Sequence, residues 1–142
     1  MTRKILLPII IGMLVLFCLA SCGKSKQASN VVTFKPGADI QTEVQEEFIL
    51  AEPDTIMQFE AGIFEFTSGL SLDVDHVTLR GRGMDKTILS FKNQEAGAEG
   101  LYITSDNVLV EELAIEDTKG NGLKSHTANN IIIRRVRTEW TG

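Results

Sequence analysis

The chain has few of the residues from which covalent cross-links and metal sites are built. Its 142 residues include only two cysteines, two histidines, one tryptophan and one tyrosine. Cys18 lies inside a long apolar run, so a mature chain that has lost this run keeps only Cys22. A single cysteine excludes an intramolecular disulfide and a cysteine-based zinc site. The zinc-protease, phosphate-loop and nucleophile-elbow motifs are also missing.

The chain also has fewer basic than acidic residues. The sequence has 14 Lys and Arg against 19 Asp and Glu, a formal net charge of -5. Arg3 and Lys4 are the only charged residues among the first 21, so their removal makes the remaining chain about -7. An acidic chain is a poor match to nucleic acid or to an anionic lipid surface. No cluster of carboxylates with calcium-loop spacing is visible, so we expect no metal, no cofactor and no nucleic-acid partner.

The first 21 residues read as a secretory signal that is cleaved off. Two cations precede an apolar run from Ile5 to Ala20, which is short for a membrane-spanning helix of roughly 20 residues. Leu19-Ala20-Ser21-Cys22 resembles a bacterial lipobox at all four positions. The resemblance implies cleavage before Cys22, lipid such as palmitate on that residue, and anchoring in the cell envelope. Gly23 favours the outer membrane, while an ordinary signal peptide or an uncleaved anchor remains the alternative.

The rest of the chain divides into a tether and one domain. Residues 22–38 are polar and predict a flexible tether. From Asp39 to Leu50, apolar residues recur every fourth position, which predicts a short helix that Asp39 can cap. From Thr55 onward the apolar period becomes two, which is typical of strands. We therefore expect a domain over residues 39–142.

One pattern occurs three times in this domain. Each copy begins with glycine and an apolar residue, passes through a short polar turn and resumes with alternating apolar residues. The copies begin at Gly69, Gly100 and Gly122, which are 31 and 22 residues apart. A unit this small cannot bury its own apolar face, so neighbouring copies must pack on one another. A β-sandwich is the less favoured alternative, because its strands need not repeat one pattern in register.

Two stretches resemble the right-handed parallel β-helix superfamily, the architecture of pectate lyases. The first is Ile40–Val44 followed by Pro53-Asp54-Thr55-Ile56 and Gly62-Ile63-Phe64, similar to a capping helix that leads into a first coil. The second is Val77-Thr78-Leu79-Arg80-Gly81 with Lys86-Thr87-Ile88-Leu89. The closest similarity is to bacterial lipoproteins with tandem β-helix repeats. It implies an all-β domain of about three coils with a short N-terminal capping helix.

Aligning the copies separates an inner from an outer face. Leu70, Leu101 and Leu123 are expected in one inner column, and Ser71, Tyr102 and Lys124 in the neighbouring outer column. Asp73, Thr104 and His126 should form the next outer column. Lys124 with His126 could hold a sugar carboxylate and move a proton, with Tyr102 stacking on the sugar or acting as an acid. These three are the candidate catalytic residues; Asp73 and Thr104 are candidate substrate-binding residues.

Two functions stay open at this point. The resemblance implies binding or modification of an acidic polysaccharide, by a lyase- or epimerase-like reaction. The alternative is a non-catalytic envelope scaffold that docks a partner protein, and the outer-face residues would then be merely solvated. The repeat also stops without a capping element after Trp140. We therefore expect this sequence to be the front part of a longer array, since an uncapped array exposes strand edges.

Overall fold

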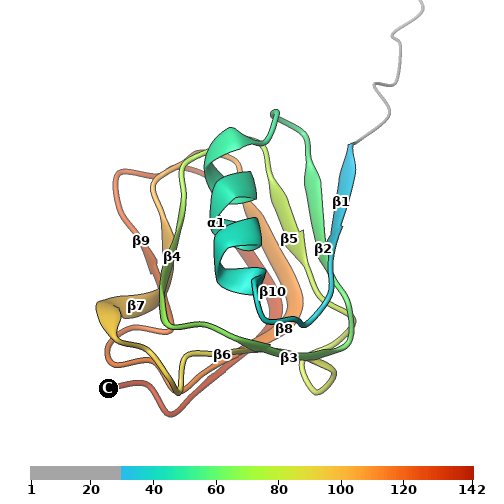
Figure 1. Ribbon diagram of the computed structural model, residues 1–142. Helices are drawn as coiled ribbons and strands as arrows, with labels where there is room; N and C mark the ends of the chain where they lie inside the picture. Colours follow the sequence, from blue (N-terminus) through green and yellow to red (C-terminus); the bar gives the residue numbers. More distant parts are fainter. Residues whose placement is uncertain (1–29) are drawn as a thin grey trace, which may run out of the picture.

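The structure, a computed structural model, describes residues 30–142, so the predicted signal, the lipidation site at Cys22 and the tether up to residue 29 lie outside it. The described chain consists mostly of β-strands in parallel sheets, with one short helix (Figure 1). The strand-rich class predicted from the period of two is therefore confirmed. The elements are β1 (Val31–Phe34), α1 (Ile40–Leu50), β2 (Ile56–Phe59), β3 (Gly62–Glu65), β4 (Ser68–Leu72), β5 (Thr78–Arg80), β6 (Thr87–Ser90), β7 (Ala96–Ile103), β8 (Leu109–Glu116), β9 (Leu123–Ser125) and β10 (Ile132–Glu139).

The folded part begins earlier than the sequence predicts. Val31 to Phe34, inside the region expected to be a tether, form β1 and pair in parallel with Ile56 to Phe59 of β2. Phe34 is 1% exposed, and its ring centroid lies 5.0 Å from that of Phe59. This strand was not predicted because the residues around it are polar, as is typical of a tether. Its burial makes residues 31–34 part of the domain.

The strands form a seven-stranded and a three-stranded sheet. In the larger sheet, the first half of β8 pairs with β5 and its second half pairs with β6. Between the halves, Glu112 has a left-handed backbone with φ of 58°, and Arg135 of β10 repeats this with φ of 50°. A left-handed residue turns the chain sharply. The larger sheet therefore bends at these residues, and its two parts lie on two sides of the domain in Figure 1.

The smaller sheet contains β4, β7 and β9, in that order. It forms the left side of the domain in Figure 1, with β1, β2 and β5 on the right and β3 and β6 along the bottom. All strand pairs in both sheets are parallel. Parallel neighbours need long connections, which explains why paired residues here are separated by more than 20 positions.

The helix α1 covers the end of the domain nearest the viewer in Figure 1. Its stripe of Ile40, Val44 and Phe48 is 0–2% exposed, as its fourfold spacing predicts. Each such buried side chain contributes roughly 1.5–3 kcal/mol to folding. The predicted side-chain cap by Asp39 is wrong, because only its backbone carbonyl accepts hydrogen bonds, from the amides of Thr42 and Glu43.

Two glutamines of α1 complete the edge of the smaller sheet. The Gln41 side-chain oxygen accepts hydrogen bonds from the backbone amides of Thr67 and Ser68 at 3.0 and 3.1 Å. The Gln45 amide group pairs with both backbone groups of Ser71, at 3.0 and 2.9 Å. These amides take the place of a neighbouring strand, so the β4 edge is not left open.

The three copies of the sequence pattern lie in register. Leu70 pairs with Leu101, which pairs with Leu123; the next inner position holds Leu72, Ile103 and Ser125. The residues of β4 and β7 in these columns are fully buried, whereas Leu123 is partly buried and Ser125 is exposed. The repeated glycine is explained by close approach between copies, since a Cβ at Gly100 would lie 2.8 Å from the carbonyl oxygen of Gly122.

A second repeated feature lies in the turns. His76, Asn107 and Asn130 all adopt left-handed backbones, with φ of 56–60°. Their side chains also meet: Asn130 donates to Asn107 at 2.8 Å, and the Asn107 amide lies 3.3 Å from Nε2 of His76. Asn, Asp and His tolerate this backbone better than other side chains. The three turns are therefore joined by a ladder of side-chain contacts.

Candidate functional site

The predicted outer column on the smaller sheet is present. Ser71, Tyr102 and Lys124 are paired in register on β4, β7 and β9. Ser71 and Lys124 are exposed and Tyr102 is partly buried. The Lys124 ammonium lies 5.6 Å from the centroid of the Tyr102 ring, within reach of a cation–π interaction. The alternation of the strands therefore places hydroxyl, aromatic and ammonium groups side by side.

The Lys124 ammonium has a partner that the sequence does not reveal. Its Nζ lies 2.8 Å from Oε1 of Glu99, and the two side chains are 44% and 27% exposed. The hydrogen bond from Lys124 lowers the pKa of Glu99, and the same bond raises the pKa of Lys124. Lys124 therefore remains a charged ammonium at neutral pH. A proton acceptor must be deprotonated, so this lysine is unsuited to act as a general base.

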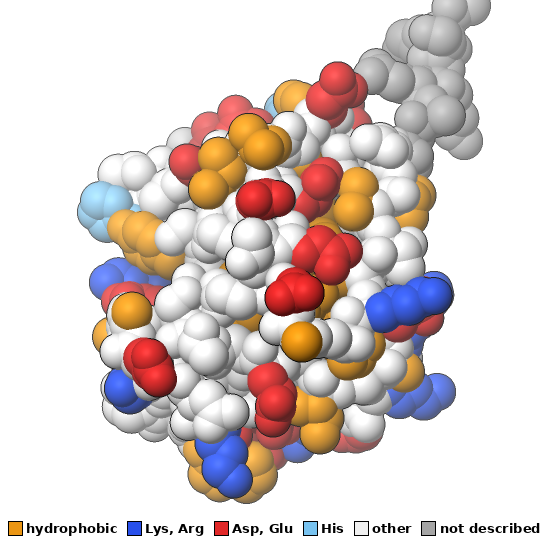
Figure 2. All heavy atoms as spheres, in the orientation of Figure 1, with side chains coloured by type: hydrophobic (Ala, Val, Ile, Leu, Met, Phe, Trp, Pro, Cys, Tyr) orange, Lys and Arg blue, Asp and Glu red, His pale blue; other side chains and the backbone are white. Residues whose placement is uncertain are grey.

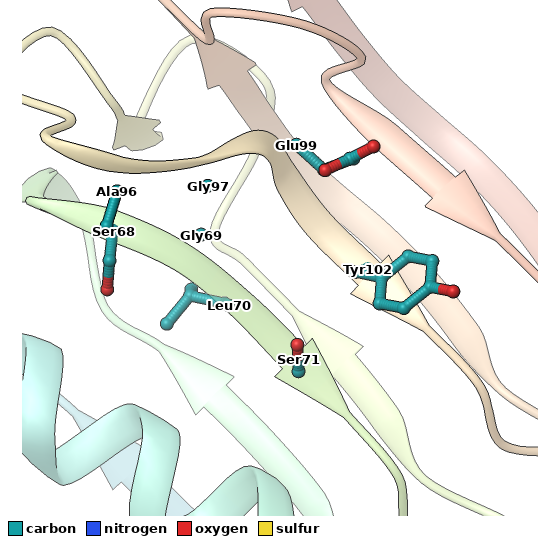
Figure 3. Close-up of a pocket in the computed structure, with 8 residues that line it drawn as sticks. All are labelled: Ser68, Gly69, Leu70, Ser71, Ala96, Gly97, Glu99 and Tyr102. Atoms are coloured by element: carbon teal, nitrogen blue, oxygen red, sulfur yellow. The ribbon is translucent and has the colours of Figure 1, made fainter.

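A shallow groove lies beside this ion pair. Its volume is about 170 Å³. Figure 3 shows Glu99 and Tyr102 extending from β7, with Ser71 at the end of β4. Gly69 and Gly97 contribute only backbone, so the groove is open between these side chains. Its lining residues are Ser68, Gly69, Leu70, Ser71, Ala96, Gly97, Glu99 and Tyr102.

The alternation of side chains along a strand does not predict that Glu99 lies at the groove, because β7 is irregular. Ser68 pairs with Ala96 but Leu70 pairs with Leu101, so β7 holds three more residues than β4 between these two pairs. Strict alternation would send Glu99 and Tyr102 to opposite faces, since they are three residues apart. The register shift places both along the groove instead. Gly97, with φ of 77°, lies in the irregular segment and is the one sequence sign of it.

The second predicted outer column is only partly connected to the first. Thr104 donates to the Leu72 carbonyl at 3.3 Å and approaches Oδ1 of Asp73 at 3.4 Å. The backbone amide of His126 donates to the carbonyl of Ile103, which places this residue directly after β9. Asp73, Thr104 and His126 are all exposed. Within residues 30–142, no hydrogen bond or ion pair joins the His126 ring to Lys124 or Tyr102.

A separate network of ion pairs lies on the outer side of the larger sheet. The Glu111 carboxylate is 3% exposed and accepts from Arg80 at 2.7 Å and from Arg134. Burial alone would raise the pKa of Glu111, but hydrogen bonds from both arginines hold it below the ordinary value of 4.5. Arg80, Glu111 and Arg134 are paired in register on β5, β8 and β10. This network joins strands and contains no group free to react.

Further along the same strands, the acidic and basic groups again pair with one another. Arg135 binds Glu112, and Arg137 binds Glu116 at 2.8 Å and Glu139 at 3.0 Å. Among residues 30–142, no group of three or more His, Cys, Asp or Glu side chains is placed to hold a metal ion. The described part of the chain also contains no helix with the length and apolarity needed to cross a membrane.

Comparison with known proteins adds no further constraint. No protein-family model matches the chain, no curated protein matches it significantly, and no solved structure does so. The site is therefore interpreted from its own geometry, which combines a groove, a tyrosine, a hydroxyl and a neutralised ion pair.

Proposed function

We propose that the domain is a short right-handed parallel β-helix. Three observations support this architecture. All strands pair in parallel, the three copies of the sequence pattern lie in register, and the bends at Glu112 and Arg135 direct each long strand from one side of the domain to the next. A helix covers one end, which is how an array of repeats protects its apolar interior. An experimental structure of the domain tests the coiled path of the chain and its handedness.

We further propose that this domain binds a polysaccharide on the outer face of β4, β7 and β9. The observation that carries the proposal is the in-register row of Ser71, Tyr102 and Lys124 beside the groove (Figure 3). An aromatic ring supplies rigid apolar contact, and hydroxyl, carboxylate and ammonium groups supply oriented hydrogen bonds. A sheet face with such a row suits an extended polymer, since each strand offers one contact.

Binding is better supported than catalysis. Lys124 is ion-paired and protonated, which leaves the exposed imidazole of His126 as the candidate proton acceptor and Tyr102 as the candidate acid. A lyase-like reaction at these residues would release an unsaturated sugar that absorbs ultraviolet light. Loss of that signal in His126→Ala, with binding retained, is the expected outcome if the site is catalytic. Binding without any turnover would support the purely binding function.

The decisive test of the binding proposal is a Tyr102→Ala variant. We expect its affinity for an immobilised glycan panel to fall at least tenfold, because the variant removes the only aromatic group in the groove. Ile63→Ala is the matched control: Ile63 is an exposed, large side chain on β3, outside the groove. Equal affinity of the Tyr102 variant and the wild type for every glycan would contradict the proposal.

A second function, docking of a partner protein, is favoured by a different observation. Ile132, Ile133 and Trp140 are 51%, 54% and 69% exposed on or just after β10. Within residues 30–142, the outer edges of β9 and β10 have no strand partner. Such an edge can pair with a strand of another protein. Crosslinking in whole envelopes through a photoreactive residue at position 132 tests this function, and no captured protein would argue against it.

The proposed location is the bacterial cell envelope, most specifically the outer membrane, with the protein anchored by lipid on Cys22. The support is the sequence at Leu19 to Cys22 and the apolar run before it. Metabolic labelling with a palmitate analogue tests the anchor. Label and membrane association should both disappear in Cys22→Ser. Persistent membrane association of that variant would point instead to an uncleaved N-terminal anchor.

A further inference from the structure

The charges at the groove argue for a specific class of sugar, an inference that rests on the proposed polysaccharide binding. Glu99 lines the groove, and its carboxylate is ion-paired with Lys124, with 2.8 Å between Nζ and Oε1. Their charges cancel, so the groove has no free cation for a ligand carboxylate. No Lys or Arg belongs to the residues that line it.

A uronate in this groove would meet repulsion from Glu99 that Lys124, already paired with Glu99, offsets only in part. Its carboxylate would approach that of Glu99, and two like charges about 4 Å apart repel measurably even in water. The Lys124 ammonium has three donor positions and could contact both carboxylates, but its single positive charge would then face two negative charges. The two carboxylates would be much closer than a Debye length, so ionic screening is modest and the penalty should appear as roughly a tenfold loss of affinity.

A neutral sugar, by contrast, matches the groups present. An ionised carboxylate offers about four acceptor positions, and Lys124 occupies one, so the hydroxyls of a sugar ring can donate to the remainder. The ammonium can donate to an adjacent hydroxyl, and Ser71 can do either. Tyr102 provides an apolar surface for the ring itself.

The dimensions of the groove limit the ligand further. At about 170 Å³ it is smaller than the roughly 300–1,000 Å³ of sites for drug-sized ligands. Only about one sugar ring can sit between Glu99 and Tyr102, and adjacent rings of a polymer must lie over neighbouring strands. We propose that this groove recognises a neutral, hydroxyl-rich pyranose unit within a longer glycan, and that Glu99 rejects uronates. A lyase-like reaction removes the proton beside a uronate carboxylate, so this preference favours the binding function over that reaction.

The test compares sugars that differ only in charge. Full-length protein in detergent is titrated calorimetrically with hexasaccharides of glucose, mannose and galactose and with the hexuronates oxidised at C6. The wild type should bind at least one neutral hexasaccharide about tenfold more tightly than its hexuronate. In Glu99→Gln the preference should shrink or reverse, because the freed Lys124 becomes available to the uronate carboxylate.

A control separates this effect from a change in overall charge. Glu65→Gln removes one negative charge from an exposed residue of β3, outside the groove, and should leave the neutral-to-uronate ratio unchanged. A wild type that binds none of the six oligosaccharides overturns the proposed polysaccharide binding. A wild type that binds hexuronates at least as tightly, or a ratio unaltered by Glu99→Gln, overturns the assignment of Glu99 and leaves polysaccharide binding intact.

Discussion

The two ends of the domain are stabilised in different ways. At one end, α1 lies over the sheets with Ile40, Val44 and Phe48 buried. The side chains of Gln41 and Gln45 form hydrogen bonds with backbone groups at the edge of β4. At the other, β9 and β10 have no neighbour on their outer edges within residues 30–142, and Ile133 is 54% exposed. Figure 2 shows the first end, where Asp and Glu side chains lie over α1 while Lys and Arg gather at the sides.

Ion pairs join the last strand to its neighbour, whereas the covered end is joined by apolar contact. Three glutamates of β8, at positions 111, 112 and 116, each bind an arginine of β10. Exposed ion pairs contribute little, about 0–1 kcal/mol each, whereas a buried aliphatic side chain contributes roughly 1.5–3 kcal/mol. The comparison teaches that β10 is held mainly by its backbone pairing and by the well-buried Glu111, and that α1 is held by its packing.

The largest expected change in the free energy of unfolding comes from replacing an isoleucine with alanine, which can be done at each end of the domain. Ile40→Ala should lower the free energy of unfolding by about 2–5 kcal/mol, since Ile40 is 2% exposed and the variant leaves a cavity. Ile133→Ala should cost only about 1 kcal/mol, because half of that side chain already meets water. Urea unfolding measures both. Equal losses would mean that Ile133 is covered in solution and that the two ends are alike.

The next effect concerns the charges that hold β10. Glu111→Gln should destabilise the domain by about 2 kcal/mol, because it weakens charge-assisted hydrogen bonds at a side chain that is 3% exposed. Glu112→Gln is the matched control at a side chain that is 31% exposed, with an expected cost below about 1 kcal/mol. If both variants behave like the wild type in urea unfolding, charge plays no part in retaining β10.

The dependence on pH sharpens the same contrast. The folded pKa of Glu111 lies below its ordinary value of 4.5, so its contribution is complete above that value and is lost as pH falls through the folded pKa. The stability difference between wild type and Glu111→Gln should therefore shrink as the pH is lowered below 4.5. Urea unfolding at a series of pH values measures it, and a difference that stays constant down to pH 2 would exclude ionisation of Glu111 as its cause.

The smallest effect concerns the polar part of the covered end. Gln45→Ala removes two hydrogen bonds to the Ser71 backbone and should cost about 1 kcal/mol. Hydrogen exchange of the Ser71 amide should accelerate, since this amide then faces water. Glu46→Ala, at an exposed residue of the same helix, is the control and should leave that exchange rate unchanged. Unaltered exchange in Gln45→Ala would show that packing alone protects the β4 edge.

Much of the fold could be predicted from the sequence, but only the outline of the site. The helix stripe, the period-two strands and the register of Leu70 with Leu101 all follow from local periodicity, which is a property of neighbouring residues. Tyr102 and Lys124 were placed in one row by the same reasoning. Glu99 was not, because its position depends on a register shift between β4 and β7. Such a shift is decided by how two distant segments pair.

The sequence did not predict the ion pairs of Glu111 for a similar reason. Alternation predicts which face a side chain occupies, but Glu112 and Arg135 have left-handed backbones that interrupt the alternation. Neither residue type favours this conformation, so nothing in the local sequence marks the bend. The register of β5, β8 and β10 places Glu111 beside Arg80 and Arg134, which are 31 and 23 residues away in sequence.

By itself, the sequence determined the strand-rich class, the covering helix and the matching of the three copies, and it predicts a signal with a lipidated cysteine. Periodicity and composition carry these because each depends on residues close together in the chain. The tertiary structure decided that β1 belongs to the domain, that Glu99 neutralises Lys124 and that α1 replaces a strand at the β4 edge. Each of these is a contact between segments some 20 or more residues apart, whose geometry exists only after the strands have paired.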